Sequence, residues 1–382
     1  MDLKDIPSLE QLSALRPAPQ ASAPEGLNER IRVLHQRICA AAPGVARVAC
    51  ALYEPDTGLL KTLAHSTCEG KPLTGYQFAL AQSPSLLSLA RERRTRVIDD
   101  IPAMQPGQSE HSRWLREQGY QSSYTVPLEH NGEFDGFVFF DAREPAYFSP
   151  TITAQLDIYG QLVALMISHE LLSIRALVGS VKLAREFAHL RDIETGVHLD
   201  RMAHYVRLIA QGVALQHRLT DEFIELLFLF APLHDLGKVG VPDEVLLKPG
   251  PLSPDERRTM QAHVDKGSAM VARLLRSFRL EAMSGVSVLR NLVASHHELM
   301  DGSGYPQGLR GEAIPIEARI VAVADVFDAL TSQRPYKDAW PLQRAYDALE
   351  AMAQRGQLDA ECVRALQDGV VDVLAIMARF AE

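Results

Sequence analysis

The sequence is poor in cysteine and has no cysteine pair at the spacing of a thiolate metal site. Among 382 residues there are four cysteines, and none belongs to a Cys-x-x-Cys motif: Cys39, Cys50, Cys68 and Cys362. This scarcity argues against a disulfide framework and predicts a reducing environment, for which the cytoplasm is the natural place. No cysteine-based metal site is expected.

An excess of positive charge is also absent, since 39 Lys and Arg residues stand against 48 Asp and Glu residues, for a formal net charge of −9. Duplex nucleic acid and anionic membranes select basic surfaces, so neither is an expected partner. The apolar run 162–167 is far shorter than the roughly 20 residues that span a bilayer. The segment MDLKDIPSLE lacks the basic and apolar regions of a signal peptide. These features predict a cytoplasmic protein without membrane insertion.

The length is sufficient for two domains, each with its own hydrophobic core. Residues 1–25 include a Pro-, Ala- and Ser-rich stretch and predict a flexible leader. Residues 26–160 mix strand and helix patterns, with two strands joined by a turn at Asn131-Gly132 or just after it. Residues 191–382 have a helical pattern throughout. The prediction is an α/β domain followed by an all-helical domain.

A long helical pattern joins the two halves. Apolar residues recur every three or four positions over residues 151–190, and the only breakers are Gly160 and Gly179. One interpretation assigns residues 161–190 to a connecting helix that pairs with its twin in a homodimer. The other is a pair of ordinary helices, each packed on its own domain. The pattern favours neither.

The helical half contains an ordered series of histidines and carboxylates. Its members are Glu194, His198, His234, Asp235, His263, His296, His297 and Asp325. Any one of these histidines, taken alone, is more often a surface or hydrogen-bonded residue than a metal ligand. Several of them, however, lie in apolar stretches such as LFLFAPLHDLG, where an ionisable group is costly unless it is paired or bound to metal. The series therefore predicts a shared metal centre.

The donors of this series are imidazole and carboxylate, with no thiolate. Such a set suits Fe, Mn, Ni or Zn, and it disfavours Ca and Mg, which prefer all-oxygen shells. The number of donors indicates more than one ion. Two ions about 3.5–4 Å apart, bridged by a carboxylate and a water, can hydrolyse a phosphate ester. We therefore expect a phosphohydrolase in which a metal-bridging hydroxide attacks phosphorus.

The order of these motifs resembles the HD-GYP family, a branch of the HD metal-dependent phosphohydrolases. The resemblance covers about residues 180–350 and consists of E-x-x-x-H, HDxGK, a single His, HHE with DGSGYP, and D-x-x-D-A-L-T-x-x-R-P-Y-K. It implies hydrolysis of the bacterial second messenger cyclic di-GMP to pGpG and onward to GMP. It also implies two or three divalent ions, Fe first and Mn as the alternative, and contact with GGDEF-domain proteins.

The resemblance further implies a role for each ligand. The basic HD set, in which Asp235 bridges two ions, is matched by His198, His234, Asp235 and Asp325. The ligands of the second ion are matched by His263, His296 and His297. Glu194 matches the carboxylate of members that hold a third ion.

Catalytic and substrate-binding residues follow from the same resemblance. Lys238 matches the basic residue beside the metals, which stabilises or protonates the departing oxygen. Arg334 and Lys337 resemble the phosphate-binding pair. Gly304 and Tyr305 belong to the turn that would shape the substrate lip, although a packing role for Tyr305 is an equal alternative.

One further carboxylate stands a helical turn after a predicted ligand. We expect Asp328 to orient a ligand or a cation and not to bind metal.

The first half resembles a GAF domain, an α/β sensory module, through RTRVIDDIP and YTVPLEHNGEFDGFVFFD. The NKxFDE motif of the cyclic-nucleotide class is missing, and Cys68 is either a chromophore anchor or, more commonly for such a cysteine, a packing residue. We expect a GAF sensor that regulates the phosphodiesterase and contributes to a homodimer. Two alternatives remain: a phosphodiesterase for another cyclic dinucleotide such as 3′,3′-cGAMP, and a signalling scaffold for GGDEF partners.

Overall fold

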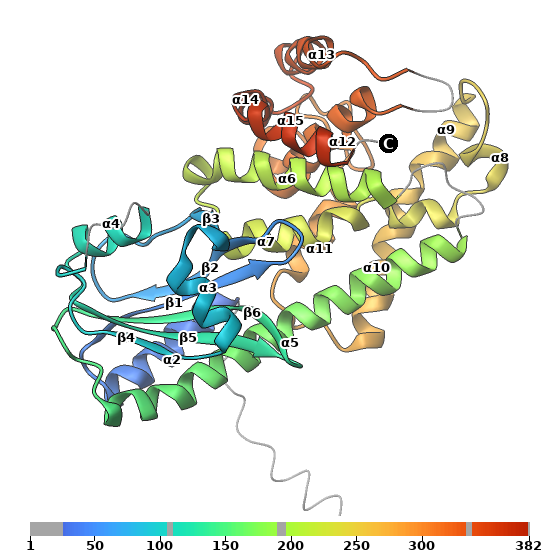
Figure 1. The fold of residues 1–382 in the computed structure, drawn as a ribbon. Helices are drawn as coiled ribbons and strands as arrows, with labels where there is room; N and C mark the ends of the chain where they lie inside the picture. Colours follow the sequence, from blue (N-terminus) through green and yellow to red (C-terminus); the bar gives the residue numbers. More distant parts are fainter. Residues whose placement is uncertain (1–25, 105–109, 189–195, 334–337, 381–382) are drawn as a thin grey trace, which may run out of the picture.

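The computed structural model describes residues 26–104, 110–188, 196–333 and 338–380. Figure 1 shows a sheet-containing N-terminal unit, a helical C-terminal unit, and a long helix that runs from one into the other. The predicted succession of an α/β domain, a connecting helix and an all-helical domain is confirmed. The predicted leader, residues 1–25, lies outside the described residues.

The N-terminal unit contains a six-stranded sheet with strand order β3-β2-β1-β6-β5-β4. All neighbouring strands pair antiparallel. The strands are β1 (Val45–Glu54), β2 (Leu59–Thr67), β3 (Gln77–Ala79), β4 (Arg96–Ile98), β5 (Ser122–His130) and β6 (Glu133–Ala142). The predicted turn joins β5 to β6: Asn131 and Gly132 both have positive φ, 50° and 84°, as a tight hairpin of this hand requires.

Each face of the sheet is covered by helices. Side chains such as Val48 and Phe140 form a core with α2 (Leu27–Ala41) and α5 (Pro150–Ala188). On the opposite face, Phe137 and Phe139 pack with residues of three short helices. These are η2 (Leu80–Gln82), α3 (Pro84–Glu92) and α4 (Glu110–Glu117).

Helix α5 is continuous, which excludes a pair of separate helices, while the pairing with a second copy stays a prediction. It begins at Pro150, so the predicted boundary at residue 160 falls inside it. Val163 and Ile167 pack in the core of the N-terminal unit, whereas Ile174 and Leu177 pack in the core of the helical unit. Its part Pro150–Val181 is long and apolar enough to cross a membrane by length and composition, with a mean hydropathy of 1.6 in its most apolar window. Burial in two cores accounts for part of that composition, since 39% of the window is buried.

In the C-terminal unit, from residue 196 onward, all regular elements in the described part of the chain are helices, as predicted. Its longer helices are α6 (Gly196–His217), α7 (Asp221–Phe230), α10 (His263–Phe278), α11 (Val286–Ser295), α12 (Ile316–Thr331) and α13 (Leu342–Gln354). Its other elements are η3 (Ala231–Leu233), η4 (Leu236–Gly240), α8 (Asp243–Leu246), α9 (Pro254–Gln261), η5 (Gly311–Ala313), α14 (Ala360–Asp368) and α15 (Val370–Arg379). Helices α6, α11 and α12 pack together around the apolar core.

The start of α7 connects the two units. Thr220 caps this helix by accepting a hydrogen bond from the backbone N–H of Phe223. The next carboxylate, Glu222, reaches the first turn of α2 and accepts hydrogen bonds from the backbone N–H groups of Leu27 (2.5 Å) and Asn28 (3.0 Å). Because Glu222 is buried, these bonds hold the N-terminus of α2 firmly against the helical unit.

Candidate metal centre

The His-Asp pair of the helical unit lies where two short 3-10 helices meet. His234 follows η3, and Asp235 precedes η4. This junction lies against the start of α10, because Gly237 has no side chain. A Cβ atom at position 237 would lie 1.8 Å from the carbonyl oxygen of His263, so only glycine allows this approach. The sequence HDLG thereby brings Asp235 and His263 into one site.

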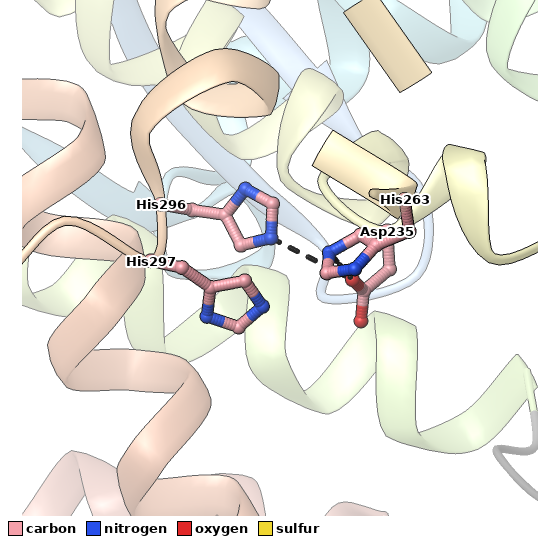
Figure 2. A group of neighbouring side chains, drawn as sticks. All are labelled: Asp235, His263, His296 and His297. Atoms are coloured by element: carbon pink, nitrogen blue, oxygen red, sulfur yellow. Dashed lines mark ion pairs between the residues drawn. The ribbon is translucent and has the colours of Figure 1, made fainter. Parts of the chain in front are cut away.

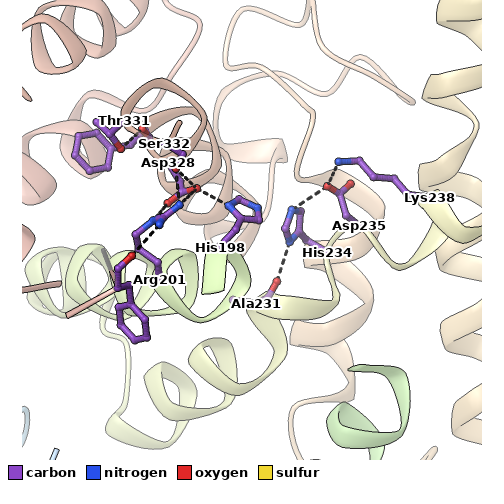
Figure 3. Close-up of polar contacts among 11 residues, drawn as sticks. His198, Arg201, Ala231, His234, Asp235, Lys238, Asp328, Thr331 and Ser332 are labelled. Atoms are coloured by element: carbon purple, nitrogen blue, oxygen red, sulfur yellow. Dashed lines mark hydrogen bonds and ion pairs between the residues drawn. The ribbon is translucent and has the colours of Figure 1, made fainter. Parts of the chain in front are cut away.

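The Asp235 carboxylate is the centre of the site. Its Oδ1 lies 3.1 Å from Nε2 of His263 and 3.5 Å from Nε2 of His296. Its Oδ2 lies 3.1 Å from Nε2 of His234 and 2.6 Å from Nζ of Lys238. Figure 2 shows the rings of His263, His296 and His297 gathered near this carboxylate, and Figure 3 shows His234 and Lys238 at its other oxygen.

Backbone carbonyl groups set the orientation of three of the imidazoles. The Nδ1 atoms of His234, His263 and His296 lie 2.9, 2.8 and 3.0 Å from the carbonyl oxygens of Ala231, Met260 and Leu292. Because a carbonyl oxygen only accepts, each Nδ1 carries a proton, which leaves Nε2 as the atom of each ring that can offer a lone pair to the site. This is the usual arrangement around a metal-ligating histidine.

The convergent atoms have no hydrogen bonds of their own. Nε2 of His234, His263 and His296 and Oδ1 of Asp235 are buried and make no hydrogen bond within the described part of the chain. Their mutual distances are short, yet the groups do not point along hydrogen-bond directions. Buried polar atoms without partners are costly, and a cation among them removes that cost.

The donor set fits divalent transition-metal ions. One ligand atom from each of Asp235, His263, His296 and His297 lies within 4.8 Å of the others. Imidazole nitrogen with carboxylate oxygen suits Fe, Mn, Ni and Zn. A divalent metal site is therefore supported, and the identity of the metal is a separate question.

Electrostatics in the site favour an ionised Asp235. Burial alone would raise the pKa of this carboxyl, but Lys238 and His234 hold the pKa well below its usual range. Burial lowers the pKa of His297 to about 2, with a further contribution from the neighbouring His296. The ring of His297 is therefore neutral and ready to act as a ligand at ordinary pH.

A second group of residues holds His198. Its Nδ1 donates to Oδ2 of Asp328, and Figure 3 shows its ring directed toward the His234 side of the site. Arg201, one turn further along α6, binds Oδ1 of Asp328. Asp328 therefore orients a predicted ligand, as expected. Burial acts to lower the pKa of His234, but Asp235 and, with a smaller contribution, half-buried Asp325 on α12 raise that pKa to about 9.

The loop after the histidine pair is held by Glu298. This buried carboxylate accepts hydrogen bonds from the backbone N–H groups of Gln307 (2.7 Å) and Leu309 (2.9 Å). A Cβ atom on Gly304 would lie 2.3 Å from the backbone nitrogen of Leu299, so this glycine permits tight packing of the loop on itself. The ring of Tyr305 lies 4.7 Å from the ring of His297, centroid to centroid. Tyr305 is thus beside the metal centre.

Several predicted residues cannot be compared with the structure. Glu194, Arg334 and Lys337 lie outside the described residues. Conversely, the sequence reasoning did not single out Arg201, Gly237 or Glu298. Spacing offered a signal for Arg201, which stands three residues after His198 on one helical face. Gly237 and Glu298 are adjacent to predicted motifs, but their roles depend on contacts with other segments.

Replacing Asp328 by Asn should weaken the centre without unfolding the protein. Asn keeps the size of the side chain but loses the charge that holds His198 and Arg201, so metal affinity should fall about 10- to 100-fold. Metal titration with equilibrium dialysis measures this. The control is Asp372→Asn on α15, which should leave affinity unchanged. Equal affinity of the wild type and Asp328→Asn would contradict an orienting role.

The convergent imidazole and carboxylate groups are those of a metal-binding site in a helical domain. Residues 192–362 match the family described as HD domain, so the helical unit is an HD domain. A cyclic di-GMP phosphodiesterase response regulator of Xanthomonas campestris pv. campestris is 45% identical over 201 residues, covering 52% of this chain and 50% of the relative. A cyclic di-GMP phosphodiesterase of Vibrio cholerae is 38% identical, covering 58% of this chain and 46% of the relative. The chain thus spans about half the length of these curated relatives.

Other similar proteins have different names. A 3′3′-cGAMP-specific phosphodiesterase of Vibrio cholerae is 39% identical, covering 49% of this chain and 34% of the relative. Among solved structures, the GAF domain/HD domain protein from Geobacter sulfurreducens is 20% identical with a TM-score of 0.32, covering 40% of this chain and 98% of that one.

Proposed function

We propose that this protein is a metal-dependent phosphodiesterase that hydrolyses cyclic di-GMP to pGpG and onward to GMP. The observation that carries the proposal is the convergence of buried Nε2 atoms on Asp235 within an HD domain. The substrate is taken from the names of the relatives, several of which are cyclic di-GMP phosphodiesterases.

The metal ligands proposed in this chain are those of the sequence series, with Fe as the first choice and Mn as the alternative. When bound, the ions would supply Lewis acidity and lower the pKa of a water molecule. Asp235 would contribute a charge shared between ions, since both of its oxygens face histidine nitrogens. The backbone-bound imidazoles would keep their orientation during the reaction.

Lys238 is the proposed acid or electrostatic stabiliser. Its ammonium nitrogen lies 2.6 Å from Oδ2 of Asp235, at the edge of the proposed metal centre, where an ammonium group can donate a proton. A developing negative charge on the departing oxygen would be stabilised by such a group. Arg334 and Lys337 are proposed to bind the phosphates, and Gly304 with Tyr305 the substrate lip.

The direct experiment is hydrolysis by purified protein loaded with iron or manganese without oxygen. Cyclic di-GMP should be consumed, and pGpG and GMP should be separated by chromatography. Lys238→Met should retain the metal and lose turnover. Intact cyclic di-GMP in the presence of a full metal complement would refute the proposal.

A second candidate substrate is 3′,3′-cGAMP, because relatives 36–39% identical carry that specificity in their names. Hydrolysis rates measured side by side with cyclic di-GMP and with 3′,3′-cGAMP decide between the two substrates. A scaffold for GGDEF-domain proteins is the alternative outside catalysis. Cellular signalling that survives loss of hydrolysis in an Asp235 variant would favour it.

The N-terminal unit is proposed to be a sensor, consistent with a cavity of about 620 Å³ on the sheet face opposite α2 and α5. Its lining includes the apolar side chains of Phe78 and Phe139 and the polar side chains of Arg96 and Thr125. The Thr125 hydroxyl is buried and has no hydrogen-bond partner in the ranges that the structure describes. A polar ligand would satisfy this group.

Regulation through the Glu222 contact can be tested directly. In Glu222→Gln one oxygen becomes an amide that faces the N–H donors of α2, so the two units should separate slightly. Turnover of cyclic di-GMP should change several-fold while metal content stays constant. The control is Glu29→Gln on α2, because the Glu29 side chain pairs with exposed Arg32 and not with α7. Unchanged turnover in Glu222→Gln would argue against regulation by this contact.

A homodimer through α5 is also proposed. Ile158, Leu162, Leu165 and Leu172 are exposed by 63, 43, 66 and 41%, and they are separated by four, three and seven residues, which places them on one side of the helix. Such a stripe is the surface of a helix that pairs with a second copy. Sedimentation velocity should show a dimer for the wild type and a monomer for Leu165→Glu. A monomeric wild type would exclude this interface.

A further inference from the structure

A second group of metal-ligating side chains lies in the N-terminal unit, away from the histidine centre. His35 and Cys39 stand one turn apart on α2, and Cys68 directly follows β2. One ligand atom from each residue lies within 4.8 Å of the other two. The expectation from sequence, that no cysteine takes part in a metal site, did not anticipate this because residues 39 and 68 meet only in the fold.

The spacing of the donors is close to that of a tetrahedral metal complex. Bonds of about 2.0 Å to nitrogen and 2.3 Å to sulfur require a nitrogen–sulfur distance of about 3.5 Å and a sulfur–sulfur distance of about 3.8 Å. Nε2 of His35 lies 3.9 Å from Sγ of Cys68. This distance exceeds the tetrahedral value by a few tenths of an ångström, and all three donor atoms lie within 4.8 Å of one another, so rotation of the cysteine side chains can complete the geometry.

The surroundings of His35 match a ligand held by a second layer of contacts. Nδ1 lies 2.8 Å from the hydroxyl oxygen of Ser66, and Nε2 lies 3.0 Å from the carbonyl oxygen of Val45. Without metal, Nε2–H donates to Val45 and the Ser66 hydroxyl donates to Nδ1. With metal at Nε2, the proton resides on Nδ1 and is donated to Ser66, because a hydroxyl can also accept.

Access and burial also fit a metal site with an open position. His35 is buried, Cys39 is half-buried and Cys68 is exposed, so an ion can enter from the side of Cys68. The carbonyl oxygen of Val45 also lies 3.5 Å from Sγ of Cys39. This oxygen or a water can complete four-fold coordination. Three protein ligands with an open fourth position are typical of zinc.

We propose that His35, Cys39 and Cys68 form a binding site for a soft divalent metal ion, of which Zn²⁺ is the type. Binding forms two metal–sulfur bonds and one metal–nitrogen bond, and it releases the two thiol protons to solvent. The site is independent of the proposed phosphodiesterase activity. It joins the C-terminal end of α2 to β2, while Glu222 of the helical unit holds the other end of the same helix.

The experiment uses the full chain, stripped of metal by a chelator, kept reduced and titrated with Co²⁺ as a spectroscopic substitute for Zn²⁺. Thiolate bound to Co²⁺ gives a charge-transfer absorption in the near ultraviolet, which ligation by imidazole and carboxylate does not produce. The wild type should show this band, and added Zn²⁺ should remove it. Cys39→Ser and Cys68→Ser should each lose it, and exposed Cys68 can be replaced without disturbing the core.

Two controls separate this site from the rest of the protein. Cys362→Ala should keep the band, because that cysteine is buried in the helical core. Asp235→Asn should also keep it, since the histidine centre contributes no thiolate. The proposal fails if the wild type shows no band, if the band survives in both Cys39→Ser and Cys68→Ser, or if Cys39 and Cys68 form a disulfide under reducing conditions instead of taking up metal.

Discussion

Asp235→Asn should lower the proposed turnover of cyclic di-GMP by at least about 10³-fold and release metal from the candidate metal centre. Both oxygens of Asp235 face histidine nitrogens, and Oδ2 also holds Lys238. Asn keeps the volume but removes the negative charge, so the cations of the centre lose their shared partner. Metal content by mass spectrometry and hydrolysis by chromatography measure the two losses together.

The matched control is Asp255→Asn, which changes a carboxylate that is exposed and pairs only with Arg258 at the surface. Exposed pairs of this kind contribute little, so both metal content and turnover should remain at the wild-type level. Asp235→Asn protein that retains its full metal complement and its turnover would show that this carboxylate is not the centre of the site.

Gly237→Ala should damage the site through packing alone. The added Cβ atom would lie 1.8 Å from the carbonyl oxygen of His263 and 2.5 Å from the backbone nitrogen of Gly267, so η4 and α10 must move apart. Overpacking costs about 1–3 kcal/mol or more, and a displacement of about 1 Å at a catalytic group can cost about 10²-fold in rate. The midpoint temperature of thermal unfolding and the turnover should therefore both decrease.

Gly179→Ala is the corresponding control. A Cβ atom at this position of α5 meets no atom within 4 Å, and alanine is a better helix former than glycine. Stability should stay equal or rise slightly, and turnover should not change. If Gly237→Ala behaved like Gly179→Ala, the close contact between η4 and α10 would not be required for the site.

Features that depend on residues close together in the sequence could be predicted from the sequence. The hairpin at Asn131-Gly132 was predictable because a tight turn needs residues that tolerate positive φ, and both residues have it. Helical periodicity was sufficient to predict the all-helical second unit, since each helix buries one face. The His and Asp residues could be predicted to share a metal centre because buried ionisable groups in apolar stretches need a common partner.

Other features depended on contacts between distant segments. The continuity of α5 could not be decided from its pattern, because one helix in two cores and two helices in separate cores bury the same residues. The motif predicted Lys238 and Asp235 as catalytic residues, and the 2.6 Å distance between Nζ and Oδ2 of this pair is a property of the folded turn.

Residue types and their order along the chain therefore determined which groups this protein brings to a metal centre and in which half of the chain they lie. Only the tertiary structure decided that Gly237 must be a glycine, that Arg201 supports Asp328, and that two cysteines 29 positions apart meet beside His35. The physical reason is that periodicity and burial cost act within one element. Steric fit and ligand convergence arise between elements that the chain places together only on folding.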